Sequence, residues 1–465
     1  GRSTWGSGVT TTVVNELRIY TQDNFGEDLI FNVRDGGIFY WDTSANTLGT
    51  SRAIPLTAVA GGTLWITGTT YAVGNTVYSP ANYLSYESQT AFTSTTDPSA
   101  DATNWVQISD LTTPTVAKQV LVSDRDRHVV VFGCDSETNP GVQDPLLIRF
   151  SSQESVTTWT ASATNTAGDL RVGVGSEIVC AVETTRQVLV FTDVSLHAMQ
   201  FLGPPFTFGI DRLSENTTIA GPLAAKAVDD TVFWMGVEEF YVYTGQVQKL
   251  PCSVRSFVFN DFNLSQMELV TASLNSSFSE IWWFYPSASS QEIDKYVVYN
   301  YQEKVWYYGS MVRTYWLDRG VNDFPVAAST DGYLYNQEFG LNDGSTTPPT
   351  AITSYIESSQ LSIGDGEDFV FLSRLIPDIT FAASTSTAPT VNMTFQTRNA
   401  PGGQYLQSNV SGVTETATTP VEQFTEQAFI RLRGRAFALK VDSSTLDTQW
   451  RLGTTRVDVR PDGRR

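Results

Sequence analysis

Histidine, cysteine and long apolar runs are all scarce in this chain of 465 residues. The sequence has 2 histidines, His128 and His197, and neither lies in a zinc-binding or catalytic motif such as HExxH. Its 3 cysteines are odd in number and far apart, which is typical of isolated buried residues and predicts synthesis in a reducing compartment. No apolar run approaches the ~20 residues that cross a bilayer. We therefore expect no metal site, no disulfide framework, no cofactor and no membrane insertion.

Basic side chains are the second shortage, with 29 lysines and arginines against 49 aspartates and glutamates and a net charge of −20. No lysine or arginine occurs from Ala53 to Ala117. Residues 370–465 nevertheless carry 11 basic and 8 acidic side chains, so the acidity belongs to the rest of the chain, at −23. A surface of this sign repels the phosphate backbone and gains nothing from counterion release. Tight non-specific binding of nucleic acid is therefore excluded, whereas loose enclosure of DNA is not.

A repeated pair of strands dominates the first three quarters of the chain. In each instance a short alternating strand is followed, after a polar turn, by a second strand that is strongly apolar or aromatic. The second strands recur about every fifty residues once the stretch 61–110 is set aside. Four pairs are followed closely by a third strand, and units of this length are the signature of β-propeller blades. The predicted pairs are Glu16–Gln22 with Leu29–Val33, Lys118–Ser123 with Val129–Phe132, Glu177–Val182 with Val188–Phe191, Ala224–Val228 with Val232–Met235, Leu269–Leu274 with Ile281–Tyr285, and Phe324–Ser329 with Tyr333–Tyr335.

The rest of the chain is also predicted to be β-structure. No window of roughly 12 or more residues combines a helical apolar period with good helix formers and a cap. The stretch Gly340–Pro349 has the composition of a linker, and alternating strands follow it. We therefore predict an all-β chain: a β-propeller of about six blades over residues 1–60 and 111–345, a small inserted β module over 61–110, and a β-sandwich-like platform domain over 346–465.

Carboxylates are numerous enough to raise the question of catalysis. The nucleophile motif GxSxG and the phosphate loop GxxxxGK[ST] do not occur in the sequence. A glycosidase pair of carboxylates stays open, because a sequence does not reveal which two acids face each other across a sugar. The turn Asp124–Arg127 is most simply the polar connection between two blade strands. We therefore assign no catalytic residue and expect the protein not to be an enzyme.

A distinctive order of aromatic and small residues marks the insert. Its members are Trp65, Tyr71, Gly74, Val77, Tyr83, Tyr86 and Trp105. The order resembles the W…YxxGxxV…Y…W pattern of the small chitin- and cellulose-binding modules of bacterial glycosidases. The resemblance implies that Trp65, Tyr83 and Tyr86 contact a glycan by stacking on sugar rings. Alternatively these aromatics form the core of so small a module, and Ser88-Gln89 stand where the family has an adjacent pair of exposed aromatics.

Motifs at the two ends of the chain carry the most specific signal. Near the start, Tyr20–Ile30 reads YTQDNFGEDLI and Gly36–Asp42 reads GGIFYWD. Near the end, Arg431–Ala436 reads RLRGRA, Trp450–Gly453 reads WRLG and Arg456–Arg464 reads RVDVRPDGR. Together these motifs resemble the packaged-DNA stabilisation proteins, or tail nozzle proteins, of short-tailed bacteriophages. Apart from the insert, the resemblance covers most of the chain.

This second resemblance implies a structural ring of six subunits in the virion tail, assembled in the cytoplasm of the bacterial host. The ring hangs beneath the portal and a tail adaptor protein, near tail fibre, spike or needle proteins. Its lumen retains packaged double-stranded DNA and conducts it outward at ejection without binding it tightly, which fits acidic walls. Arg431, Arg433, Arg435 and Arg460 are expected at subunit or adaptor contacts, or alternatively as arginines that merely alternate outward on a sheet.

Two other functions stay open at this point. A propeller that carries a carbohydrate module also fits a glycan-binding or glycan-hydrolysing protein. A nozzle whose insert touches a host-surface glycan combines both functions.

Overall fold

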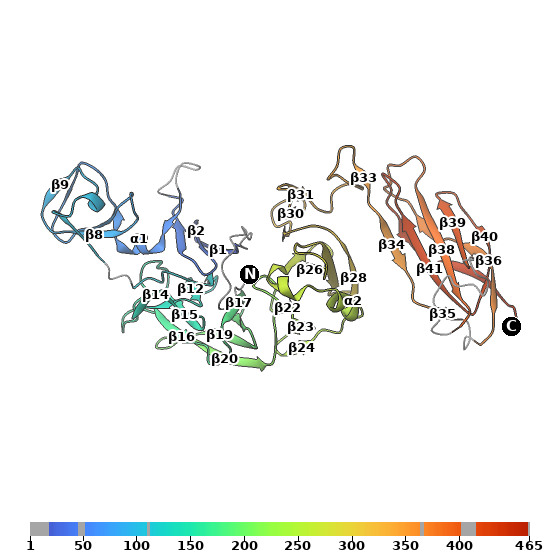
Figure 1. Ribbon diagram of the computed structural model, residues 1–465, viewed down its shortest axis with the longest axis horizontal. Coiled ribbons are helices and arrows are strands. Elements are labelled where there is room, and N and C mark those ends of the chain that lie inside the picture. The colour runs from blue at the N-terminus through green and yellow to red at the C-terminus, as the bar shows by residue number, and fades with distance from the viewer. Residues whose placement is uncertain (1–17, 45–51, 109–111, 363–366, 401–414, 464–465) are drawn as a thin grey trace, which may run out of the picture. The chain divides into compact units, whose positions relative to one another are not determined.

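A computed structural model describes residues 18–44, 52–108, 112–362, 367–400 and 415–463 of the chain. The described residues form mostly β-strands, with α1 (Leu56–Gly61) and α2 (Arg255–Asn260) as the α-helices. No helix among the described residues is long and apolar enough to cross a membrane. The chain divides into two compact units, Gly1–Leu334 and Tyr335–Arg465. The elements of both are labelled in Figure 1, and the prediction of an all-β chain is confirmed.

The first unit contains a β-propeller built of consecutive antiparallel sheets. In each sheet the strands are hydrogen-bonded in chain order, as in a propeller blade. A separate hairpin of β13 (Asp135–Ser136) and β14 (Asn139–Gln143) lies in the connection between the second and third strands of the second blade. The four-stranded blades are β1 (Tyr20–Phe25), β2 (Asp28–Val33), β3 (Ile38–Trp41) and β4 (Ile54–Pro55); β11 (Gln119–Val122), β12 (Val129–Phe132), β15 (Leu147–Phe150) and β16 (Gly168–Arg171); β17 (Ile178–Glu183), β18 (Val188–Thr192), β19 (Ser195–Gly203) and β20 (Thr207–Glu215); β21 (Ala225–Val228), β22 (Thr231–Met235), β23 (Phe240–Tyr243) and β24 (Val247–Lys249); and β25 (Thr271–Asn275), β26 (Glu280–Tyr285), β27 (Lys295–Asn300) and β28 (Val305–Ser310).

A sixth sheet of three strands follows: β29 (Tyr315–Leu317), β30 (Val326–Ala328) and β31 (Leu334–Asn336). The prediction that Phe324–Ser329 holds the first strand of this blade is wrong, because β29 precedes β30 and pairs with it. The Trp316 ring stacks on Trp282 at 5.2 Å, and this burial holds β29 in place. A strand of three residues is too short to show alternation in a sequence.

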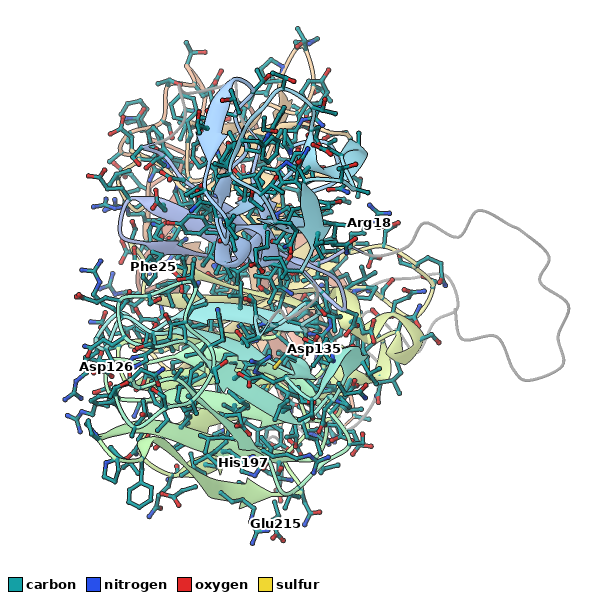
Figure 2. The ribbon with its side chains drawn as sticks, turned by 90° about the vertical axis from the view of Figure 1, so that its left-hand side faces the viewer. Arg18, Phe25, Asp126, Asp135, His197 and Glu215 are labelled. Atoms are coloured by element: carbon teal, nitrogen blue, oxygen red, sulfur yellow. The ribbon has the colours of Figure 1, made fainter. Side chains whose placement is uncertain are left out.

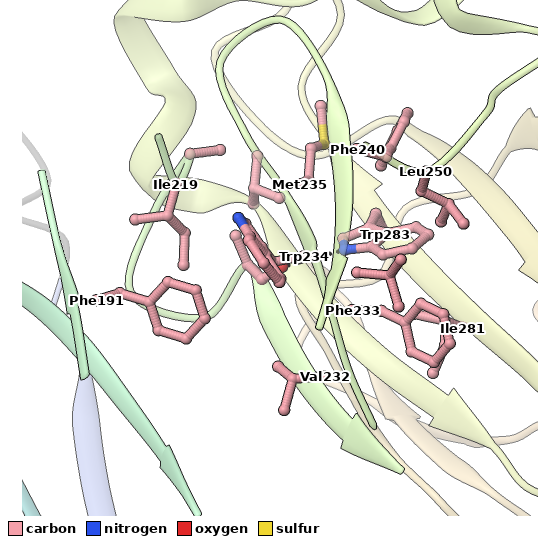
Figure 3. Close-up of a cluster of buried hydrophobic side chains, with 14 of the residues drawn as sticks. Phe191, Ile219, Val232, Phe233, Trp234, Met235, Phe240, Leu250, Ile281 and Trp283 are labelled. Atoms are coloured by element: carbon pink, nitrogen blue, oxygen red, sulfur yellow. Dashed lines mark hydrogen bonds between the residues drawn. The ribbon is translucent and has the colours of Figure 1, made fainter. Parts of the chain in front are cut away.

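The blades are arranged around an axis with their first strands innermost. Each first strand contacts the first strand of the next blade, in the order β1, β11, β17, β21, β25 and β29. Large aromatic side chains fill the space between blades three, four and five, as Figure 3 shows. Trp283 of β26 is fully buried, packs against Phe240 at 4.9 Å, and donates its indole N–H to the Ala224 carbonyl at 3.1 Å. The interior is therefore continuous from one blade to the next.

The insert forms a small β module with its own core. Its sheets have the strand orders β10-β8-β7-β5 and β6-β9, and a short 3-10 helix spans Pro98–Ala100. Tyr71, Val77, Tyr86 and Trp105 are buried together at its centre. The strands are β5 (Thr63–Leu64), β6 (Thr69–Tyr71), β7 (Thr76–Tyr78), β8 (Ser85–Ser88), β9 (Phe92–Ser94) and β10 (Trp105–Gln107).

The second unit is a β-sandwich. One sheet has the order β34-β41-β38-β39, with β35 also on β41, and the other has the order β40-β36-β43. Leu372 and Leu432 of the second sheet share one apolar core with Val391, Phe395 and Val441 of the first. The short sheets β32-β33 and β37-β42 complete the unit. Its strands are β32 (Asn342–Asp343), β33 (Thr350–Ala351), β34 (Ser354–Glu357), β35 (Leu361–Ser362), β36 (Val370–Ile376), β37 (Ile379–Thr380), β38 (Thr390–Arg398), β39 (Thr416–Glu422), β40 (Ala428–Gly434), β41 (Ala436–Ser443), β42 (Arg451–Leu452) and β43 (Arg456–Pro461).

Candidate functional site: an acidic rim of blade turns

The turns that join the first and second strands of the blades lie at one end of the propeller axis. All blades run through their strands in the same order, so equivalent turns fall at the same end. In Figure 2, Phe25 and Asp126, next to two of these turns, lie on the left, whereas Arg18 and Asp135, at the opposite ends of their blades, lie on the right. The turns therefore form a common edge of the propeller.

Contacts between neighbouring turns make this edge continuous over several blades. The Arg127 guanidinium of blade two lies beside Gly26 of blade one. The Asp124 backbone N–H donates to Glu183 Oε1 of blade three at 3.1 Å. Arg186 of blade three pairs with Asp230 of blade four at 3.0 Å. Each turn is thus positioned by the next one.

Carboxylates outnumber guanidinium groups along this edge by nine to four. The arginines are Arg125, Arg127, Arg186 and Arg319. We call the edge the acidic rim, and its carboxylates are Asp23, Glu27, Asp124, Asp126, Glu183, Asp229, Asp230, Asp318 and Asp323.

Glu183 is the most perturbed carboxyl of the acidic rim. Burial raises its pKa to about 7, and the charges of Asp124, Asp23 and Asp126 add to the rise. The hydrogen bond from the Asp124 N–H opposes this shift without cancelling it. The pKa of Asp23 is also raised, by burial and by Asp124, although it accepts a hydrogen bond from the Val122 N–H at 2.9 Å. Like charges are therefore crowded at this point of the rim.

A recess of about 600 Å³ opens beside Glu183, between the turns of blades two, three and four. Asp124, Arg125, Thr184 and Asp229 line it with Glu183. Within the described residues, no group of three or more histidine, cysteine, aspartate or glutamate side chains is placed to hold a metal ion. The recess is open and has charged side chains of both signs in its lining, which suits solvent and counterions.

Buried polar contacts hold blades one, two and three together behind the rim. Lys118, at the start of blade two, is nearly buried and pairs with Asp35 at 3.3 Å and Glu177 at 2.8 Å. The Gln119 amide and the Ala181 backbone exchange two hydrogen bonds of 2.7 Å. These contacts fix the angle between neighbouring blades, and with it the spacing of the rim turns.

The three aromatics that are predicted to contact a glycan differ in their exposure to solvent. Tyr86 is only 7% exposed and lies in the core of the insert, where its hydroxyl accepts a hydrogen bond from Asn82 at 2.7 Å. Trp65 is half-buried, and its indole N–H donates to Ser94 Oγ at 2.9 Å. Tyr83 is the most exposed of the three, at 38%. Glycan contact by these residues stays a prediction, and Tyr83 offers the most accessible ring.

The four predicted contact arginines lie in the second unit. Arg431 and Arg460 are exposed, whereas Arg433 and Arg435 are half-buried. Both half-buried guanidinium groups lie over the Phe369 ring, at 4.0 and 4.8 Å from its centroid. Their role at a subunit or adaptor contact stays a prediction.

The acidic rim itself was not predicted as a site, although the turn Asp124–Arg127 was placed correctly between β11 and β12. Its members come from turns of separate blades, and only the propeller axis brings them to one edge. The two histidines take no part in it. His128 is buried among Phe150, Phe201 and Phe208, and burial lowers its pKa.

No protein-family model matches the chain, and no curated protein matches it. Among solved structures, the chain is similar to the CNH domain of AfRom2, with 9% identity over 73% of this chain and 86% of that chain and a TM-score of 0.32. It is also similar to BamB from Moraxella catarrhalis, with 11% identity over 68% of this chain and 82% of that chain and a TM-score of 0.31. Similarities this distant carry no argument about function.

Proposed function

We propose that this chain is the tail nozzle of a short-tailed phage, a ring-forming structural protein whose channel retains packaged DNA and conducts it at ejection. The acidic rim is the observation that carries the proposal. The sequence motifs that resemble nozzle proteins support it, because the first of them, Tyr20–Ile30, supplies β1, the first turn of this rim and the start of β2.

The physical reason is electrostatic. A DNA duplex carries one negative charge per ~1.7 Å of its axis, so a conduit that attracts it would hold it by counterion release. A carboxylate-rich surface keeps the duplex from adhering, and confinement by the ring then retains the DNA without affinity. The chain makes and breaks no covalent bond in this account. The proposed partners are further copies of the chain, a tail adaptor and the DNA that passes.

The assembly state of the purified chain tests this proposal. We expect native mass spectrometry to give a closed ring of six copies at low micromolar concentration. A fluorescent DNA duplex should show no measurable binding to that ring at 150 mM salt. A protein that stays monomeric, or that binds the duplex tightly at this salt concentration, contradicts the proposal.

An additional contact with a host-surface glycan is favoured by the exposed ring of Tyr83 on the insert. Deletion of residues 61–110 tests it, with phage adsorption and ring assembly measured separately. We expect adsorption to fall while assembly persists. Loss of assembly alone contradicts a receptor-binding role. A glycan-hydrolysing propeller would instead turn over sugar substrates, which the nozzle function does not predict.

A further inference from the structure

The outward side of the sheet β40-β36-β43 in the second unit (Figure 1) is rich in arginine. Alternation along the strands sends Leu372 and Leu432 into the sandwich core and leaves the positions between the core residues facing outward. Five of these outward positions are arginine, and none is lysine. We call this surface the arginine face, and its members are Arg374, Arg431, Arg433, Arg456, Arg460 and Phe429.

Strand register brings these side chains into rows. Phe371 of the central strand β36 lies directly between Arg433 of β40 and Arg460 of β43. Arg433 is held in place, since it pairs with Asp462 and its guanidinium lies over the Phe369 ring. Arg460 is exposed and has no ion pair with any described residue. Arg433, at one end of this row, is therefore held by contacts within the chain. Arg460, at the other end, is available to bind a partner.

The next row has the same character. Arg374 lies between Phe429 and Asp458, and its Nε donates to Asp458 Oδ2 at 2.7 Å. Phe429 is 76% exposed, although it stands among charged groups. Arg431 and Arg456, on the outer strands, are exposed and form no ion pair within the described part of the chain. One outer strand thus presents the exposed Phe429 ring and Arg431, and the other presents Arg456 and Arg460; these three guanidinium groups have no ion pair among the described residues.

Strand β38 in the other sheet has outward positions of a different composition. Before Arg398 they are Thr390, Asn392, Thr394 and Gln396, and the Thr394 hydroxyl is hydrogen-bonded to Thr418 at 3.0 Å. Arginine and large aromatics are enriched at protein interfaces and lysine is depleted, because planar guanidinium groups and rings give much contact for little lost entropy. The arginine face has the composition of an interface.

We infer that the arginine face binds the carboxylate-rich first unit of a neighbouring copy of this chain. Residues 1–334, the first unit, carry 35 acidic and 18 basic side chains, so the complementary surface is present in every copy. Guanidinium groups pair with carboxylates in a forked geometry that lysine cannot supply. Two arginine faces repel each other, so the contact joins unlike surfaces. Contacts of that type generate rings when the rotation from copy to copy closes on itself. The inference deepens the proposed nozzle function and rests on its ring assembly.

A charge-reversal variant tests the inference on the full chain. The variant R431E/R456E/R460E changes three exposed arginines without an ion pair among the described residues, and circular dichroism and thermal unfolding verify that it folds. Arg451→Glu is the matched control, because Arg451 is exposed in the same unit but lies in β42, outside the arginine face. Sedimentation velocity at 50, 150 and 500 mM salt is the measurement. We expect the wild type and R451E to form rings at 150 mM salt, and the triple variant to weaken assembly at least 100-fold (~3 kcal/mol).

The outcomes separate this inference from the proposed function. A triple variant that assembles like the wild type overturns the inference and leaves the nozzle function standing. A wild type that never assembles overturns the proposed function and the inference with it. A wild-type arginine face that binds a DNA duplex at 150 mM salt, with the triple variant inactive, overturns the inference in favour of a nucleic-acid surface. Replacement of the three arginines by lysine, which keeps the charge but not the fork, should weaken assembly about tenfold.

Discussion

The acidic rim of the propeller and the arginine face of the sandwich are opposite in charge but similar in construction. Each is a set of polar side chains that alternation or a turn directs away from an apolar layer. Beneath the rim that layer contains Val120 and Val129, and beneath the arginine face it contains Leu372 and Leu432. The buried residues are of the same kind in both, so the fold does not require either charge. Opposite charges on the two surfaces are what the proposed contacts with passing DNA and with a neighbouring copy require.

The two units also differ in how their sheets are joined. Blades one to three are joined by polar links around the nearly buried Lys118, whereas the two sheets of the sandwich meet through a mainly apolar core around Phe395. The first arrangement fixes geometry, because hydrogen bonds and ion pairs have preferred directions. The second mainly supplies stability.

The largest expected effect comes from truncating one large buried side chain in the core of each unit, one unit at a time. We expect Trp283→Ala to lower the free energy of unfolding of the first unit by about 4 kcal/mol, and Phe395→Ala to do the same for the second, because both rings are essentially buried and leave cavities. Differential scanning calorimetry should show each variant shifting only the transition of its own unit. If both transitions move together in both variants, the units unfold as one and the comparison between them fails.

The polar links of the propeller come next. Lys118→Met keeps the apolar stem but removes the ammonium group between Asp35 and Glu177, and we expect it to destabilise the first unit by about 2 kcal/mol. Both carboxylates are partly solvated, which limits the loss. Lys440→Met is the control: its Nζ lies 4.0 Å from Asp442 Oδ1 in a half-buried, long-distance pair, and the change should cost less than about 0.5 kcal/mol in urea unfolding. Equal losses of unfolding free energy in the two variants would show that the ion pairs of Lys118 stabilise the propeller no more than the pair of Lys440 stabilises the sandwich.

Reversing charge on the rim should change its behaviour toward DNA. We expect Asp124→Lys with Asp126→Lys to raise affinity for a DNA duplex about tenfold at 50 mM salt, with the gain lost at 200 mM. Fluorescence anisotropy is the measurement. Glu422→Lys with Glu426→Lys makes the same change of net charge at exposed sites of the second unit and should have little effect. A gain of the same size in this control would show that overall charge, and not the rim, governs DNA contact.

Much of this architecture was predictable from the sequence. In the first five blades a short alternating strand precedes a continuously apolar or aromatic second strand, and the second strands lie where this pattern places them, as at Val129–Phe132 and Val188–Thr192. The sixth blade was misplaced by one strand because Tyr315–Leu317 is too short to alternate. The acidic rim and the rows of the arginine face could not be predicted, since both depend on which strands and turns become neighbours in space.

The smallest expected effect concerns pH. Burial and like charges hold the folded-state pKa of Glu183 at about 7, above its ordinary value of 4.5, so the folded state binds this proton more tightly than the unfolded state. This contribution to stability is therefore lost as pH rises from about 5 to about 7. Glu183→Gln keeps the acceptor for the Asp124 N–H and should be about 2 °C more stable than the wild type at pH 8 and equal to it near pH 4. The same difference at both pH values would contradict crowding of charge at the rim.

Symmetry-resolved electron microscopy of the purified full chain tests the central claim most directly. The account predicts a six-fold ring in which the acidic rim borders the lumen and the arginine face lies against a neighbouring copy. A monomer without a central channel, or a ring whose lumen is bordered by the arginine face, would contradict it.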